Sequence, residues 1–221
     1  MKEQVRVETK GILFDMDGVL ISSIGSVVRS WRQWAERYDV PNAEIYEVPH
    51  GMRAIEIVKE LRPDIDPQEG LRVIEDIEME DVSGLKVLPG VRTLLASLPL
   101  DRWAIVTSAT HRLLIRRLEV AGLPIPQRII SADMVERGKP DPEPYRRGAE
   151  LLGLSPAECV VIEDAPSGVG AGIAAGSRVL GVLGTHSAED LKAAMWIVPS
   201  LEAVTISTGA DGLELRFSTG V

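Results

Sequence analysis

Four short segments place carboxylate, hydroxyl and ammonium side chains where they could act together in catalysis. The first, ILFDMDGVL at residues 12–20, is an apolar run that ends in Asp15 and Asp17. Such a run is typical of a buried parallel strand that delivers its last side chains into the crevice where open α/β sheets bind ligands. Buried carboxylates so close together repel each other, so we expect a cation, a shared proton or both beside them. Taken alone, the segment also fits a strand followed by an Asp-rich turn.

Two further segments could bind anionic oxygen. In RWAIVTSAT, residues 102–110, an apolar strand pattern ends at Thr107 and Ser108, whose hydroxyl and backbone N–H groups could donate to such a ligand. In ERGKPDPEPY, residues 136–145, Lys139 lies between a glycine and a proline that restricts the backbone. Each feature has an ordinary alternative, because Ser and Thr commonly cap helices and most loop lysines are solvated.

A fourth segment, VVIEDAPSGVGAGIAAG at residues 160–176, repeats the pattern of the first. Its apolar strand ends in Glu163 and Asp164 and continues into a glycine-rich turn and helix. Two acidic strand ends at one crevice could surround magnesium with oxygen ligands, and Lys139 would balance the remaining negative charge. The glycines resemble a dinucleotide-binding loop only superficially. In such loops the acid follows the glycines, whereas here the acids precede them and would repel a pyrophosphate.

Alternating strands and helices must position these four segments. β-rich runs predict strands at residues 11–15, 102–107, 128–131, 159–163 and 178–183. Helical patterns occur at residues 89–98, 110–121, 142–152 and 187–194. This alternation predicts an α/β fold with a doubly wound parallel sheet.

About 85 residues separate the first two predicted strands, far more than one crossover needs. Apolar residues recur at helical spacing over residues 26–38 and 52–61, so we expect a helical insertion. We predict that residues 1–22 and 86–221 form the α/β core and that residues 23–85 form a cap, which could exclude water and select substrate. A helical subdomain with no role at the site is the alternative.

Composition narrows the classes of partner and compartment. A net charge of −9 argues against a nucleic-acid backbone as the main partner. The single cysteine, Cys159, lies in an apolar run and excludes an internal disulfide. The charged start of the chain is unlike a signal peptide, and no apolar run is long enough for a membrane helix, so we expect a cytoplasmic protein. Residues 201–221 alternate around GADG and predict a β-hairpin. Nothing in the sequence indicates the oligomeric state.

Together, DMDGV, the strand-end Thr107, GKPDPEPY and VVIEDAPSG resemble the four ordered motifs of the haloacid dehalogenase superfamily. The resemblance spans nearly the whole chain and includes a helical cap after the first motif. Within the superfamily, the chain is most similar to the glycerol-3-phosphate and 2-deoxyglucose-6-phosphate phosphatases. Three segments carry this finer similarity: HGMRAIEIV in the insertion, LPGVRTLLASLP before WAIVTSAT, and GKPDPEPY. The resemblance implies a phosphatase that acts on a small phosphorylated metabolite.

The resemblance also implies a role for each acid. Asp15 is expected to attack phosphorus and form an aspartyl phosphate, while Asp17 protonates the leaving alcohol and then activates water. Mg²⁺ is the implied cofactor. Its expected ligands are Asp15, the backbone carbonyl of Asp17 and Asp164, with Glu163 as a further ligand or as a partner of the ligands.

The remaining implied roles concern phosphate and substrate. Thr107, Ser108 and Lys139 are expected to bind the phosphoryl oxygens, and Lys139 also supports the nucleophile electrostatically. Arg53, in the cap, is expected to reach the distal part of the substrate, because an Arg fork suits oxyanions and hydroxyls alike.

Three functions follow from these observations, in order of preference. The first is a magnesium-dependent phosphatase of small phosphorylated sugars or polyols, such as glycerol phosphate or hexose 6-phosphates. The second is a hexose-phosphate mutase of the β-phosphoglucomutase type, although those relatives usually carry an acid and a histidine where this chain has ISSI at residues 21–24. The third is a catalytically idle binding or regulatory protein that kept the fold, against which the intact Asp15, Asp17, Lys139 and Asp164 argue. Asp17 argues against carbon–halogen cleavage, because the dehalogenases lack this second aspartate.

Overall fold

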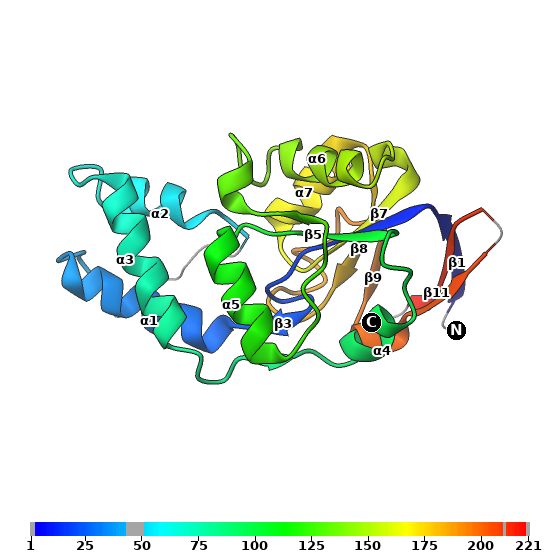
Figure 1. The fold of residues 1–221 in the computed structure, drawn as a ribbon, viewed down its shortest axis with the longest axis horizontal. Coiled ribbons are helices and arrows are strands. Elements are labelled where there is room, and N and C mark those ends of the chain that lie inside the picture. The colour runs from blue at the N-terminus through cyan, green and yellow to red at the C-terminus, as the bar shows by residue number, and fades with distance from the viewer. Residues whose placement is uncertain (1–2, 43–50, 210, 220–221) are drawn as a thin grey trace.

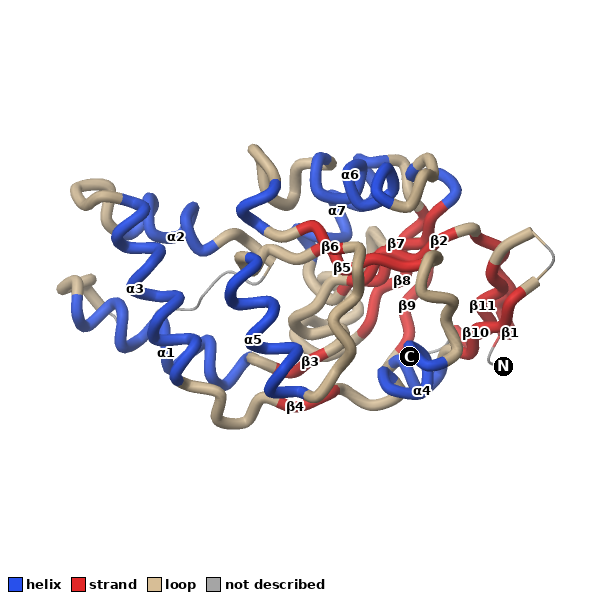
Figure 2. Tube along the Cα trace, viewed as in Figure 1, coloured by secondary structure: helices blue, strands red, loops and turns tan. Residues whose placement is uncertain are grey.

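A computed structural model describes residues 3–42, 51–209 and 211–219 of the 221-residue chain. Figure 1 shows three parts arranged in a row: the helices α1 to α3 at one end, a sheet covered by helices in the middle, and a small second sheet at the other end. Figure 2 shows the same arrangement, with the strands of the central sheet running between two layers of helix.

The central sheet has six parallel strands in the order β6-β5-β2-β7-β8-β9. Its strands are β2 (Gly11–Phe14), β5 (Trp103–Val106), β6 (Ile129–Ile130), β7 (Cys159–Glu163), β8 (Arg178–Val182) and β9 (Trp196–Val198). The five predicted strands are therefore confirmed, and β9 is an additional edge strand. Because β2 lies between β5 and β7, the ends of these three strands are neighbours.

Helices cover both faces of this sheet, as a doubly wound fold requires. They are α4 (Val91–Ala96), α5 (His111–Ala121), α6 (Glu143–Leu151) and α7 (Pro166–Ala175), with short 3-10 turns at Ala132–Met134, Pro156–Glu158 and Leu201–Ala203. Side chains alternate along β2. Ile12 and Phe14 pack in the core with α4 and α5, and Leu13 packs on the opposite face with α6 and α7.

One predicted core helix is wrong. Residues 187–194 form successive turns, in which Leu191 N–H donates to Ser187 and Ala194 N–H donates to Leu191. Asp190 accepts hydrogen bonds from the Ser187 hydroxyl at 2.6 Å and from its N–H at 3.0 Å. A segment this short forms an isolated helix only marginally, and local side-chain bonds compete with it.

The insertion is a three-helix unit with its own core. It contains α1 (Ile24–Arg37), α2 (Ala54–Leu61) and α3 (Pro67–Glu80), so the helices predicted from residues 26–38 and 52–61 are confirmed and α3 is additional. Trp34 is fully buried in this core, and its indole N–H donates to the carbonyl of Gly70 at 2.9 Å. This partner explains how the buried indole satisfies its polar atom.

A two-stranded ribbon joins the insertion to the core. β3 (Ile21–Ser22) leaves the core and pairs antiparallel with β4 (Lys86–Val87), which returns to it. The predicted domain boundaries at 22/23 and 85/86 stay a prediction.

A second, antiparallel sheet has the order β1-β11-β10, formed by β1 (Glu3–Thr9), β11 (Leu213–Thr219) and β10 (Thr205–Thr208). The hairpin predicted in residues 201–221 is thus present, and β1 extends it.

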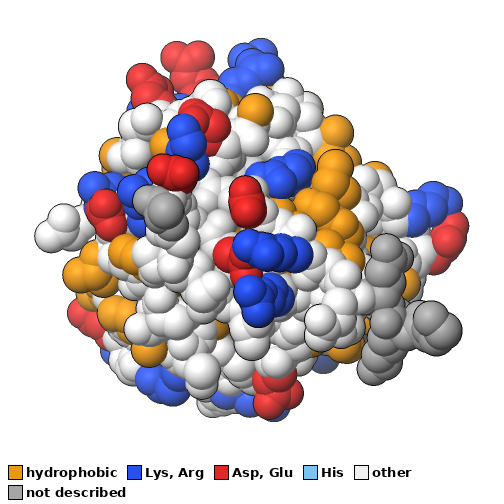
Figure 3. Space-filling model, turned by 90° about the vertical axis from the view of Figure 1, so that its right-hand side faces the viewer, with side chains coloured by type: hydrophobic (Ala, Val, Ile, Leu, Met, Phe, Trp, Pro, Cys, Tyr) orange, Lys and Arg blue, Asp and Glu red, His pale blue; other side chains and the backbone are white. Residues whose placement is uncertain are grey.

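Figure 3 faces this end of the molecule and shows basic and acidic side chains interspersed. Lys10 pairs with Glu158 at 2.6 Å there, and Arg6 pairs with Glu214. No helix in the described part of the chain is long and apolar enough to cross a membrane.

Candidate active site

Three neighbouring strands bring the predicted acids and hydroxyls together. Asp15 directly follows β2, Thr107 directly follows β5, and Glu163 is the last residue of β7. All three are buried, with exposed fractions of 6% or less. Gly18, at φ 84°, allows the chain after β2 to pass close to Asp164, because a Cβ built there would lie 1.8 Å from the Asp164 carboxylate.

Lys139 is the cation at the centre of this acidic cluster. Its ammonium lies 2.6 Å from Asp15 Oδ1, 2.6 Å from Glu163 Oε1 and 3.1 Å from the carbonyl of Val106. The side chain is 1% exposed. Burial alone would lower the pKa of the Lys139 ammonium, but the charges of Asp15 and Glu163 outweigh burial and raise it. Lys139 therefore stays charged and compensates the two carboxylates.

The Glu163 carboxylate is fully used as a hydrogen-bond acceptor. Its Oε1 accepts from Lys139 and from the Tyr145 hydroxyl at 2.6 Å, and its Oε2 accepts from the N–H groups of Asp164 at 3.0 Å and Ala165 at 3.2 Å. These contacts fix the acid that holds Lys139. Tyr145 was not among the predicted site residues, although a tyrosine on the buried face of the helix that follows Lys139 is a signal for such a partner.

The donor set at this edge of the sheet suits a hard divalent cation. Carboxylate oxygens of Asp15, Glu163 and Asp164 lie within 4.8 Å of one another. Burial raises the pKa of Asp15 to about 7, with Lys139 opposing and Glu163 reinforcing this shift. Burial also raises the pKa of Asp164, with Glu163 and Asp15 adding to the effect. A bound cation would offset this cost of ionisation, so the cluster fits Mg²⁺.

The Asp17 side chain is held apart from this cluster. Its Oδ1 accepts a hydrogen bond from the Ser23 hydroxyl at 2.6 Å, and its Oδ2 accepts one from Arg117 at 2.6 Å. The two aspartates of the first segment therefore have different partners and are free to have different roles. The predicted contribution of the Asp17 main-chain carbonyl to a metal site stays a prediction.

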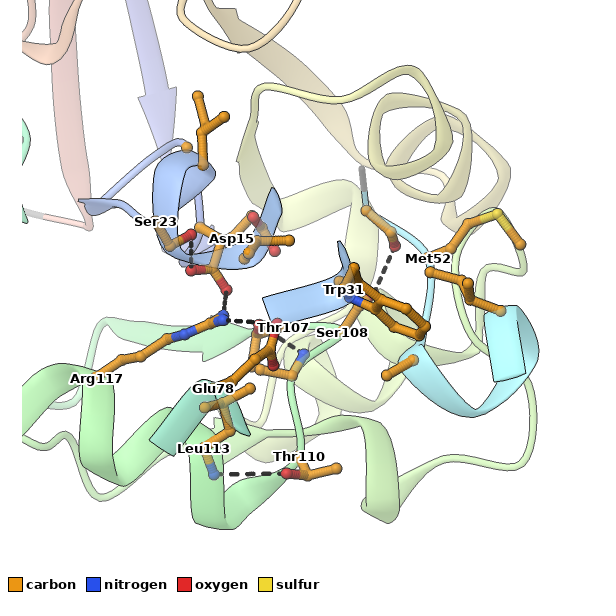
Figure 4. A pocket seen from close by; sticks show the side chains of 18 of the residues that line it. Asp15, Ser23, Trp31, Met52, Glu78, Thr107, Ser108, Thr110, Leu113 and Arg117 are labelled. Carbon is orange, nitrogen blue, oxygen red and sulfur yellow. Dashed lines mark hydrogen bonds and ion pairs between the residues drawn. The ribbon is translucent and has the colours of Figure 1, made fainter. Parts of the chain in front are cut away.

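Arg117 and Glu78 are site residues that the sequence analysis missed. The Arg117 guanidinium also lies 3.5 Å from Glu78 Oε1, and both side chains are 6% exposed. Figure 4 shows Arg117 pointing into the pocket beside Glu78. A signal was present, because Arg117 occupies the buried face of α5 one turn from Leu113 and Leu114. A charged residue in an apolar helical stripe requires a partner.

The pocket lies between the core and the cap. Core residues Asp15, Asp17, Thr107 and Thr110 line one side, and the cap residues Trp31, Met52, Ile57, Glu75 and Glu78 line the other. The Ser108 hydroxyl donates to the carbonyl of Gly51 at 2.6 Å, so this predicted phosphate ligand contacts the cap (Figure 4). The cap is therefore packed against the core edge that carries the acids.

Arg53 lies at the same junction but outside the lining of the pocket. It donates to the carbonyls of Val135 and Glu136, each at 3.0 Å, and it pairs with Glu56 at 2.6 Å. A Cβ on Gly138 would lie 2.7 Å from the Arg53 guanidinium, so this side chain packs over the loop that carries Lys139. Its predicted contact with the substrate stays a prediction.

The chain is similar in sequence or in fold to known phosphatases and hydrolases. Hexitol phosphatase A of Escherichia coli is 38% identical over 92% of this chain and 96% of its own length. Glycerol-1-phosphate phosphohydrolase 2 of Saccharomyces cerevisiae is 32% identical over 84% of this chain and 79% of its own. A hydrolase from Pseudomonas syringae, 24% identical, has the same fold with a TM-score of 0.76 over 87% of this chain and 94% of its own. Residues 9–176 match the haloacid dehalogenase-like hydrolases, and the chain belongs to this family.

Proposed function

We propose that this protein is a magnesium-dependent phosphatase that hydrolyses small phosphorylated sugars or polyols through an aspartyl phosphate on Asp15. One observation carries the proposal. The buried Asp15 is held by Lys139 next to Asp164, while Asp17, two residues away, is positioned separately by Ser23 and Arg117. A nucleophile and an acid/base with distinct environments are what two-step phosphoryl transfer requires.

In the first step, a carboxylate oxygen of Asp15 forms a bond to phosphorus while the bond from phosphorus to the substrate oxygen breaks. Asp17 transfers a proton to that departing oxygen, so the alcohol leaves neutral. In the second step, Asp17 accepts a proton from water as the water oxygen attacks phosphorus. The acyl phosphate bond breaks, phosphate leaves, and both aspartates return to their starting forms.

The surrounding residues stabilise the transferring group. Thr107 and Ser108 follow β5 and line the pocket, and Lys139 contacts Asp15 from the loop before α6, so all three would donate hydrogen bonds to phosphoryl oxygens. Carboxylates of Asp15 and Asp164 and the Asp17 main-chain carbonyl would hold Mg²⁺, whose chemistry when bound is to neutralise phosphate charge. We assign Glu163 mainly to anchoring Lys139, because its oxygens already accept four hydrogen bonds.

The distal pocket supports a neutral substrate tail. Glu75 can accept hydrogen bonds from hydroxyl groups, and Trp31 offers an apolar surface. Among the lining residues that the structure describes, the cation is Arg117, which is already paired with Asp17 and Glu78. The bisphosphate that a mutase uses as activator would need a second cation for its second phosphate. The described lining residues offer none besides the paired Arg117, so the phosphatase is favoured over the mutase. We further propose a cytoplasmic location, consistent with a single unpaired cysteine.

A turnover screen with matched variants tests this function. The wild type should release inorganic phosphate from glycerol phosphate or hexitol phosphates in the presence of Mg²⁺, and activity should fall with a chelator. The Asp15→Asn variant should release none while retaining its thermal transition. Phosphate release by Asp15→Asn at the wild-type rate would exclude the assigned nucleophile, and an isomerised sugar phosphate as the main product would favour a mutase instead.

A further inference from the structure

We propose that Arg117 is a positioning residue for the acid/base Asp17 and links it to the cap through Glu78. The inference rests on the proposed function, in which Asp17 transfers the proton. Arg117 belongs to the core helix α5 and Glu78 to the cap helix α3, so the contact spans the two sides of the pocket.

The contacts leave the Asp17 carboxylate a single orientation. Arg117 donates to Oδ2 and Ser23 donates to Oδ1, each at 2.6 Å. Rotation of the carboxylate would break the bond to a buried guanidinium, and charge-assisted hydrogen bonds of this kind are the strong ones. The carboxylate is therefore fixed before substrate arrives, which removes an entropic cost from the proton transfer.

The two partners of Asp17 differ in what they can do. A guanidinium has donors and no acceptor, so Arg117 can only donate to Oδ2. The Ser23 hydroxyl can accept as well as donate, so it can keep its contact with Oδ1 while Asp17 gives and takes a proton.

The second arm of Arg117 connects this arrangement to the cap. Glu78 Oε1 lies 3.5 Å from the guanidinium, and the adjacent contacts between α3 and α5 are also polar. Asp76 pairs with Arg112 at 2.7 Å, and Glu75 accepts from the Thr110 hydroxyl. Since the two helices meet through polar contacts, displacement of the cap would move Glu78, one of the two acids that Arg117 contacts.

Leaving-group dependence distinguishes positioning of a proton donor from a structural role. An alkyl phosphate such as glycerol phosphate needs its departing oxygen protonated, whereas p-nitrophenyl phosphate expels a stable anion. The specificity constant kcat/KM reports the steps up to alcohol release. For Arg117→Met we expect kcat/KM on the alkyl phosphate to fall about 10- to 100-fold, a part of what general acid catalysis supplies, with a loss of at most about 3-fold on the aryl phosphate.

Further variants control for loss of folding and for the buried Glu78 that Arg117→Met leaves without its partner. Arg117→Met combined with Glu78→Gln should show the same substrate-dependent loss without leaving a buried charge alone. Arg117→Lys should recover part of the alkyl activity, because it keeps the charge but loses the fork. Arg112→Met is the matched control, since Arg112 is on the same helix and pairs with the same cap helix but does not touch Asp17. It should leave the ratio of the two activities unchanged.

The outcomes separate this inference from the proposed function. If the Arg117 variants lose both activities equally or keep the alkyl activity, or if Arg112→Met changes the ratio as much, Arg117 does not position the acid. If Glu78→Gln alone leaves the ratio unchanged, the cap arm is excluded. A wild type that hydrolyses neither phosphate ester would instead contradict the proposed function, independently of any Arg117 variant.

Discussion

The buried Glu78 predicts a pH-dependent stability that can be isolated with one substitution. Burial raises the pKa of Glu78 to about 7 from its ordinary 4.5, even though Arg117 lowers it. The folded protein therefore binds a proton at Glu78 over the interval in which the unfolded chain has already released it. By linkage, ionisation of Glu78 destabilises the fold, and this loss develops as pH rises from about 4.5 to about 7.

The magnitude follows from that interval. At about 1.4 kcal/mol per pKa unit, a shift from 4.5 to about 7 is worth about 3 kcal/mol of unfolding free energy above neutral pH. Glu78→Gln removes this titration without shortening the side chain. The variant should gain about 2 to 3 kcal/mol relative to the wild type between about pH 5 and about pH 8.

Denaturant unfolding at these two pH values measures the effect directly. Glu69→Gln provides the control, because Glu69 is exposed on the same helix and the substitution is the same. It should follow the wild type at both pH values. If the stability difference between Glu78→Gln and the wild type does not change with pH, the argument that burial raises the pKa of Glu78 is refuted.

Three further predictions concern the acidic cluster. Lys139→Met should lower activity at least about 1000-fold and stability by about 3 to 5 kcal/mol, because it leaves two buried carboxylates without their cation. Phosphate release and denaturant unfolding measure the two losses, and a stable, active variant would contradict the role assigned to Lys139. Mg²⁺ affinity should rise as pH increases through about 7, since burial raises the pKa of Asp15 and the metal must displace its proton. Calorimetry in two buffers of different ionisation enthalpy should show proton release, and a pH-independent affinity would contradict a raised pKa of Asp15. Gly18→Ala should weaken Mg²⁺ binding more than Gly84→Ala. Both glycines have a positive φ, but only at Gly18 would a Cβ clash with the Asp164 carboxylate. Equal losses of Mg²⁺ affinity in the two variants would show that backbone strain alone is responsible.

The part of the site that follows strand ends could be predicted from the sequence. Apolar runs that stop at Asp15, Thr107 and Glu163 identify parallel strands, and the carboxyl ends of neighbouring parallel strands meet at one edge. Lys139 could be added because a cluster of buried acids requires a cation. These inferences depend on local patterns and on charge balance, both of which a sequence displays.

The partners of Asp17 could not be predicted in the same way. Arg117 lies 100 residues further along the chain, and its contact depends on how α5 is rotated against the sheet. Glu163 was expected near the metal, but the hydrogen bond that it accepts from the Tyr145 hydroxyl depends on the packing of α6. No spacing in the sequence reveals that packing. The pairing of β1 with β11 was missed for a related reason, because the short alternation in β1 does not show which strand, about 200 residues further along the chain, it pairs with.

That pairing of β1 with β11 has a consequence for how the protein is made. Glu3–Thr9 lies about 200 residues before Leu213–Thr219, and seven registered pairs connect the two strands. A chain synthesised from its amino end exposes β1 long before its partner emerges, and an unpaired strand is a template for aggregation. Arg6 and Glu8 alternate with Val5 and Val7 in β1. These charged residues would act as gatekeepers that keep the nascent strand from associating with other chains until β11 has been synthesised.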